Sequence, residues 1–135
     1  MIMNFQAKAP CILVVNDSLP LLNLYHDILD DNCEYDIELS DYAFEGIDSI
    51  VRLNPKLIIL DFEQAEKTEE WLLLQMLKMH DVTVTIPILV CVIAVQEFRE
   101  QEAHFNKQGI RLLYKPFTKQ DLLAAVQDLL TLLAS

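Results

Sequence analysis

The residues of this sequence that could do chemistry are two carboxylates and an ammonium group that directly follow apolar runs. Asp17, preceded by Asn16, follows the first run, Asp61 follows a later run, and Lys115 follows the last. A pair of carboxylates suits Mg²⁺, which binds one or two carboxylates together with phosphate oxygens and several waters. A lysine would supply a point charge to the same phosphoryl group. The pattern therefore predicts phosphoryl chemistry centred on Asp61.

These residues can meet only if the apolar runs end at the same edge of a sheet. Five segments predict strands and five predict helices, from their β-rich or helical periodicity and their capping residues. The expected strands are 11–15, 35–39, 57–60, 86–95 and 110–114, and the expected helices are one that starts within 16–20 and runs to about 31, then 42–53, 66–80, 96–107 and a last one after 115–117. Alternating strands and helices, with strands that are mostly apolar throughout, indicate an α/β fold: a doubly wound parallel sheet covered on both faces.

Sheets of this kind place their sites outside the carboxyl ends of the strands, where the strand order reverses. Neighbouring strands lie about 4.8 Å apart, so the long side chain of Lys115 can reach Asp61 from two strands away. The informative residues are therefore those that end strands.

Length and composition limit the class of protein. A chain of 135 residues fits one domain, expected at residues 10–135 after a flexible leader of residues 1–9. A net charge of -11 argues against nucleic acid as a direct partner. Three cysteines, an odd number, favour a reducing compartment, and no apolar run approaches the roughly 20 residues of a membrane span. The expected location is cytoplasmic, with no membrane partner.

Four motifs together resemble the response-regulator receiver family, and the resemblance runs from Ile12 to Leu133. They are Ile-Leu-Val-Val-Asn-Asp at 12–17, Asn-Pro-Lys-Leu-Ile-Ile-Leu-Asp at 54–61, Pro-Ile-Leu-Val at 87–90 and Tyr-Lys-Pro-Phe at 114–117. The resemblance implies a flavodoxin-like sheet of strand order 2-1-3-4-5. It also implies a Lys115-Pro116 peptide bond that is often cis.

The resemblance further implies roles for the residues of the site. Asp61 would be phosphorylated by a histidine kinase or a phosphotransfer protein, and Lys115 would contact the phosphoryl group. Mg²⁺ would be bound by Asp17, Asp61 and the backbone carbonyl of Glu63, and by Asn16 through a water. Output would pass to a downstream protein partner or through a homodimer.

The sequence departs from the family pattern at the metal site and after the phosphoacceptor. The usual acidic pair is Asn16-Asp17 here, so Mg²⁺ binding is expected to be weakened and not abolished. The usual Met-Pro after the phosphoacceptor is replaced by Phe62-Glu63-Gln64-Ala65, which predicts a different loop geometry.

The sequence also departs from the family at the conformational switch. The family needs Ser or Thr at the end of the fourth strand, where this chain offers Val92, Ile93 or Ala94, and its usual aromatic residue on the fifth strand is Leu112. Tyr114 has the same strand parity as Leu112 and could form a shifted switch. A hydrogen bond to a charged group contributes about 1.5 to 3 kcal/mol, so the missing hydroxyl predicts roughly ten- to hundredfold weaker coupling.

Three other functions compete with a phosphorylated receiver. The first is a pseudo-receiver that binds proteins without taking phosphate. The second is a Mg²⁺-dependent phosphatase of the haloacid-dehalogenase type, suggested by Asp61-Phe62-Glu63, although that family carries its Asp pair after the first strand. The third is a flavodoxin-like cofactor binder, which would need Gly in a loop where 16–20 has none. We expect a signalling module without enzymatic activity.

Overall fold

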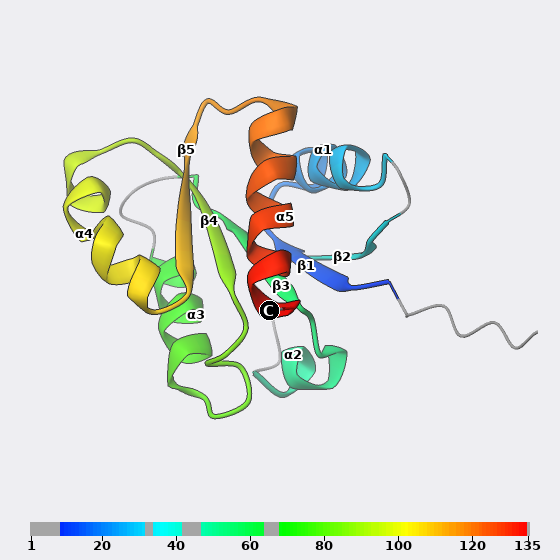
Figure 1. Cartoon of the computed structure of the whole chain (residues 1–135), viewed down its shortest axis with the longest axis horizontal. Coiled ribbons are helices and arrows are strands. Elements are labelled where there is room, and N and C mark those ends of the chain that lie inside the picture. The colour runs from blue at the N-terminus through cyan, green and yellow to red at the C-terminus, as the bar shows by residue number, and fades with distance from the viewer. Residues whose placement is uncertain (1–8, 32–33, 42–46, 64–67, 135) are drawn as a thin grey trace, which may run out of the picture.

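The computed structural model describes residues 9–31, 34–41, 47–63 and 68–134. Within these ranges five strands alternate with five helices, as expected (Figure 1). The elements are β1 (Cys11–Val15), α1 (Leu19–Leu29), β2 (Asp36–Ser40), α2 (Ile47–Leu53), β3 (Leu57–Asp61), α3 (Thr68–Met79), β4 (Ile88–Ile93), α4 (Gln96–Lys107), β5 (Ile110–Lys115) and α5 (Lys119–Ala134).

The five strands form one parallel sheet of order β2-β1-β3-β4-β5, which confirms the predicted topology. The order reverses between β1 and β3, so the crevice that such sheets use for binding opens at the carboxyl ends of these two strands. The register pairs Val15 with Leu60, Asp61 with Cys91 and Ile93 with Lys115. The ends of β1, β3 and β5 therefore lie at one edge of the sheet.

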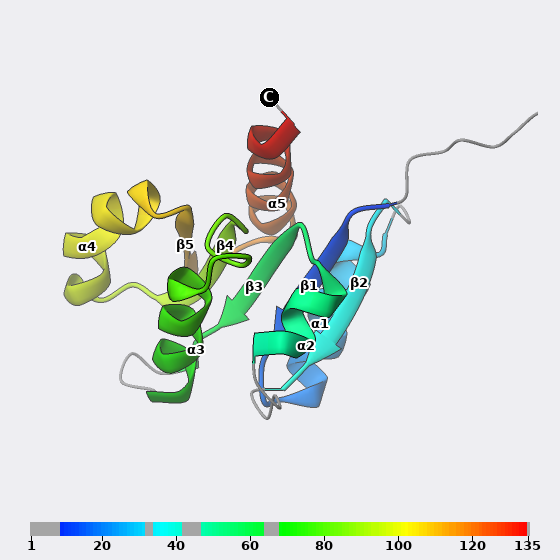
Figure 2. The same cartoon turned by 90° about the horizontal axis from the view of Figure 1, so that it is seen from below.

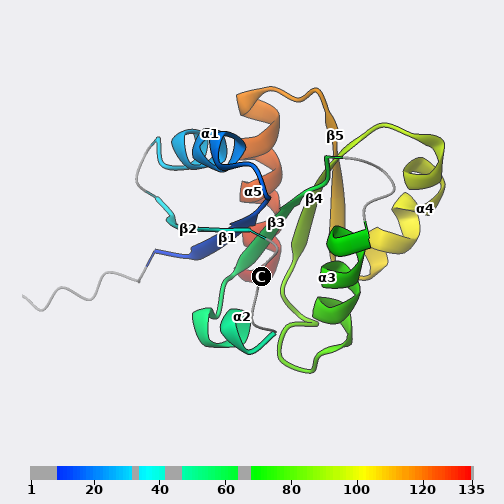
Figure 3. The ribbon, with the colours of Figure 1, turned by 180° about the vertical axis from the view of Figure 1, so that it is seen from behind.

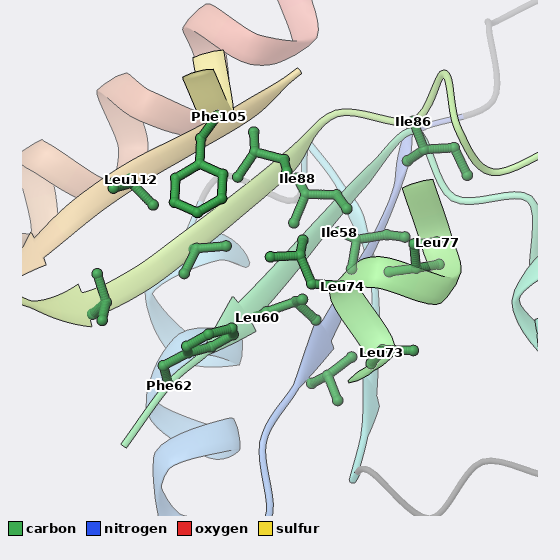
Figure 4. Close-up of a cluster of buried hydrophobic side chains, with 14 of the residues drawn as sticks. Ile58, Leu60, Phe62, Leu73, Leu74, Leu77, Ile86, Ile88, Phe105 and Leu112 are labelled. Atoms are coloured by element: carbon green, nitrogen blue, oxygen red, sulfur yellow. The ribbon is translucent and has the colours of Figure 1, made fainter. Parts of the chain in front are cut away.

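Helices cover both faces of the sheet, α1 and α5 on one face and α2, α3 and α4 on the other (Figure 2 and Figure 3). Each face has its own apolar cluster, to which alternate residues of β1, β3, β4 and β5 contribute. On β3, Leu57 and Ile59 pack toward α1 and α5, whereas Ile58 and Leu60 pack toward α3. Figure 4 shows the second cluster, which also contains Leu74 of α3. Burial on both faces explains why the central strands are apolar at every position.

Local side-chain chemistry fixes the ends of the helices next to the site. Ser18 is the N-cap of α1, where its Oγ accepts a hydrogen bond from the Leu21 backbone N–H. Thr118 and Asp121 form a capping box at the start of α5, with reciprocal hydrogen bonds of 3.0 Å. The Lys115-Pro116 peptide bond is cis. These ends hold α1 and α5 beside the carboxyl edge of the sheet.

The fourth strand is shorter than the predicted 86–95. The Ile86 N–H donates to the Thr83 carbonyl in a turn, and Lys78 Nζ donates to the carbonyls of Val84 and Ile86. At the other end, Val95 is the N-cap of α4. Backbone groups engaged in this way are not available to the sheet, so apolar character alone overestimated the strand.

Several expectations fall partly outside the described residues. The leader 1–9 is described only at Ala9, and the second helix, expected at 42–53, is described from Ile47. Cys33, Gln64 and Ala65 also lie outside. No helix in the part of the chain that the structure describes has the length and apolar character needed to cross a membrane.

Candidate functional site

Asp61 lies at the centre of the carboxyl edge of the sheet. It is the last residue of β3, a strand that is buried at every position between β1 and β4. Strand alternation from Leu57 and Ile59 turns the Asp61 side chain toward α1 and α5. The residue is only 1% exposed. A carboxylate buried this deeply needs hydrogen-bond donors or an opposite charge around it.

Lys115 supplies the opposite charge. As the last residue of β5 it reaches across β4 and places Nζ 2.7 Å from Asp61 Oδ1. The same ammonium group donates to the backbone carbonyl of Phe62 at 3.1 Å. The pairing that the sequence predicted between these two strand ends is therefore present in the structure.

Asn16 is a second donor to Asp61. Its Nδ2 lies 3.0 Å from the Asp61 carbonyl oxygen and 3.2 Å from Oδ1, while its own Oδ1 accepts from the Ser18 N–H at 2.7 Å. The side chain is buried and ties the end of β1 to the end of β3. The amide thus turns a donor toward Asp61, and the contact of Asn16 with Mg²⁺ through a water, which the resemblance implied, stays a prediction.

Tyr25 is the residue of this site that the sequence reasoning missed. It belongs to the apolar cluster under α1 and α5, where its ring is buried. Its hydroxyl, however, donates to Asp61 Oδ2 at 2.5 Å. A buried tyrosine hydroxyl usually has a hydrogen-bond partner, so a tyrosine on the inner face of this helix could have indicated a polar contact with the site. Burial, followed by nearby negative charge, raises the pKa of Tyr25 well above its ordinary value.

Cys91 lies beneath Asp61 and Tyr25. It pairs with Asp61 in the sheet register and is fully buried. Burial raises the pKa of the Cys91 thiol to about 12. The thiol is therefore protonated at neutral pH.

Asp17 and Glu63 are the exposed carboxylates next to this site, one residue beyond Asn16 and two beyond Asp61. Oxygen donors from Asp17, Asp61 and the Glu63 backbone are of the kind that Mg²⁺ prefers, so the donor set fits this ion in kind. Among the residues that the structure describes, no three His, Cys, Asp or Glu side chains are grouped as a metal site. The donors already on Asp61 would compete with a cation for its oxygens.

The switch positions carry no hydroxyl donor beside Asp61. Val92 is buried in the cluster under α3 and α4, Ile93 is 41% exposed, and Leu112 is buried. Tyr114 does share the face of Leu112, but its hydroxyl donates to Glu102 Oε1 at 2.7 Å. Arg99 lies 4.8 Å from the centre of the Tyr114 ring. Tyr114 is thus held against α4.

A cavity of about 270 Å³ reaches Asp61 from the side of α1 and α5. Asp61, Lys115 and Tyr25 contribute to its wall, and the other lining residues are Leu21, Leu24, Ile28, Pro116, Phe117 and Lys119. A larger cavity of about 530 Å³ lies between α3 and α4, away from the carboxylate. The smaller one is the path by which a reactant could approach Asp61.

Comparison with solved structures relates this arrangement to known proteins. The Vibrio cholerae chemotaxis protein CheY4 matches with a TM-score of 0.72 and 22% identity, over 90% of this chain and 99% of that one. A response regulator from Desulfuromonas acetoxidans gives 0.70 and 24%, over 92% and 98%. A response regulator receiver modulated diguanylate cyclase from Pelobacter carbinolicus gives 0.65 and 22%, over 90% and 92%. No protein-family model matches the sequence, and no curated protein matches it. The chain therefore has the fold of response-regulator receiver domains, as the sequence resemblance predicted.

Proposed function

We propose that this chain, whose fold is that of receiver domains, is a cytoplasmic module of phosphorelay signalling that accepts a phosphoryl group on Asp61. The donor would be a histidine kinase or a phosphotransfer protein. The observation that carries the proposal is the Asp61–Lys115 pair, 2.7 Å apart at the carboxyl edge of the sheet. A nucleophilic carboxylate beside a fixed ammonium group is what acceptance of a phosphoryl group requires.

The reaction follows from the groups around the carboxylate. An Asp61 oxygen would attack phosphorus while the bond from phosphorus to the donor's imidazole nitrogen breaks, and the electron pair returns to the imidazole. The Lys115 ammonium would neutralise part of the charge of about -1.5 to -2 that the phosphoryl group adds. Mg²⁺, when bound by Asp17, Asp61 and the Glu63 carbonyl, would supply further positive charge.

The cavity beside Asp61 suits delivery by a protein. Its walls are apolar side chains of α1 together with Phe117, and Leu24 at the rim is 54% exposed. An apolar rim around a buried charged pair favours a partner that covers the site and excludes water, rather than a freely diffusing anion. Output would then pass to a downstream protein or to a second copy of the chain.

Coupling from phosphorylation to output is expected to be weak. The side chains at and just after the end of β4, those of Val92, Ile93 and Ala94, cannot donate a hydrogen bond to a phosphoryl group. Leu112 on β5 has no aromatic ring that could move in response to such a bond. Tyr114 already donates to Glu102. We therefore expect a phosphorylated state that differs little from the unphosphorylated state near β4 and β5.

The test is phosphorylation by acetyl phosphate, followed by intact-protein mass spectrometry, on the wild type and on Asp61→Asn. We expect a phosphoryl adduct on the wild type that the variant lacks. A titration with beryllofluoride, with and without Mg²⁺, followed by NMR, gives an independent readout. An adduct that persists in Asp61→Asn would show that another residue accepts the phosphoryl group and would refute the proposal.

A second candidate is a pseudo-receiver that acts only through protein contacts. The observation that favours it is that donors from Lys115, Asn16 and Tyr25 already surround the Asp61 carboxylate. This candidate predicts no Asp61-dependent adduct and no response to beryllofluoride, so the same experiment separates the two functions.

A further inference from the structure

The hydroxyl of Tyr25 occupies one oxygen of the candidate nucleophile. It comes from α1, across the crevice from β3, and lies 2.5 Å from Asp61 Oδ2. The ring is 2% exposed and lies beside Phe117, with ring centres 6.3 Å apart. The hydrogen bond is therefore shielded from water, where it is stronger than a similar bond on the surface.

The two carboxylate oxygens of Asp61 accept different hydrogen bonds, which would have to break before either oxygen attacks phosphorus. Oδ1 accepts from Lys115 Nζ and from Asn16 Nδ2, at 2.7 and 3.2 Å. Lys115 is also the group that would neutralise an incoming phosphoryl group, so its contact is useful to the reaction. Oδ2 accepts from Tyr25, which is uncharged. Loss of the Tyr25 hydrogen bond would leave Oδ2 with one donor fewer, which makes it a better nucleophile, and would keep the ion pair intact.

We propose that Tyr25 is a positioning residue that holds Asp61 in a closed arrangement and sets the rate at which Asp61 takes a phosphoryl group. This inference rests on the proposed function. In the step itself, the Tyr25 hydroxyl leaves Oδ2, and Oδ2 forms a bond to phosphorus. With acetyl phosphate, the bond from phosphorus to the acetate oxygen breaks, and acetate leaves with the electron pair.

The wall of the cavity connects this hydrogen bond to the surface. Tyr25 lines the cavity together with Leu21, Leu24 and Ile28 from the same helix. A partner that packs against these side chains would act on α1, and therefore on the position of the Tyr25 hydroxyl. The closed arrangement would then slow the labelling of Asp61 by small phosphodonors, and a docked protein would open it.

The experiment measures the initial rate of phosphorylation by acetyl phosphate, by intact mass, in the wild type and in Tyr25→Phe. We expect the variant to be labelled about tenfold faster, which corresponds to about 1.4 kcal/mol. Tyr114→Phe is the matched control, because it removes another tyrosine–carboxylate hydrogen bond, of 2.7 Å, on the opposite face of the sheet. It should be labelled at the wild-type rate. Tyr25→Phe combined with Asp61→Asn should not be labelled.

The possible outcomes separate this inference from the proposed function. An Asp61-dependent adduct that forms at the same rate, or more slowly, in Tyr25→Phe would overturn the role of Tyr25 and leave the receiver function standing. No Asp61-dependent adduct in any variant would overturn both. Circular dichroism checks that Tyr25→Phe is folded, and Tyr25→Leu, which also removes the hydroxyl and stays apolar, should show the same acceleration.

Discussion

Asp61 and Phe62 are neighbours in the chain, yet their side chains lie in opposite kinds of environment. Asp61 points toward α1 and α5 into hydrogen bonds with Lys115, Asn16 and Tyr25. Phe62, which is fully buried, packs on the other face against Trp71 and Phe98, with ring centres 5.3 and 6.3 Å away.

The stability of the polar side depends on which hydrogen-bonding and charged groups surround Asp61. The stability of the aromatic side depends on the volume of the side chains around Phe62. Removing one partner of a buried charge leaves the other unsatisfied, which is costly even when the shape is preserved. An aromatic cluster loses contacts in proportion to the volume removed and tolerates swaps of similar size. One strand end therefore serves chemistry on one face and stability on the other.

The largest effect is expected on the aromatic side. Phe62→Ala should lower the free energy of unfolding by about 4 kcal/mol, because it leaves a cavity beside Trp71 and Phe98. Phe62→Leu, the matched control, keeps most of the volume and should cost about half as much or less. Chemical denaturation of both variants measures the difference, and equal losses would show that this face also depends on identity.

The next effect concerns the ion pair. Lys115→Met keeps the shape of the side chain but leaves the charge of Asp61 with its neutral donors alone, so we expect a loss of about 3 kcal/mol. Adding Asp61→Asn should recover most of it, because the buried charge is then gone. Denaturation of the two single variants and the double variant tests this. If the losses of stability in the two single variants simply add in the double variant, Asp61 and Lys115 are not energetically coupled. The proposed difference between the two faces is then wrong.

A further effect, smaller per pH unit, is expected from the titration of Cys91. The pKa of Cys91 is raised from 9.0 to about 12 in the folded protein, so between these pH values the folded state binds more protons than the unfolded state. The free energy of unfolding should therefore fall as pH rises from about 9, by up to about 1.4 kcal/mol per pH unit. Tyr25, whose pKa is also raised, adds to the fall above about pH 10.

Cys91→Ala is the variant that tests this pH dependence. Its stability should fall less steeply between pH 9 and 12 than that of the wild type, as measured by denaturation across the range. Phe62, Trp71 and Phe98 have no titratable group, so Phe62→Leu should keep the wild-type slope. An unchanged slope in Cys91→Ala would show that the thiol does not contribute.

The apolar runs of the sequence predicted the parallel sheet, because strands buried on both faces are apolar at almost every position. The order of its strands was implied by the resemblance to receiver domains, and the structure has that order. The same reasoning brought Asp61 and Lys115 together, since both end strands. It missed the hydrogen bond of Tyr25, because helical periodicity reports only that a ring faces inward and not what its hydroxyl reaches. Nor did it indicate that the Asn16 amide donates to Asp61.

The ammonium group of Lys115 has two acceptors, the Asp61 carboxylate and the Phe62 carbonyl. The backbone N–H of Phe62, in the preceding peptide, donates to the Cys91 carbonyl at 2.9 Å. A phosphoryl group that draws the ammonium toward itself would loosen one of these two attachments. Phosphorylation of Asp61 on one face of the sheet would then shift the Phe62 ring on the other face. This coupling needs neither a hydroxyl on β4 nor an aromatic residue at position 112.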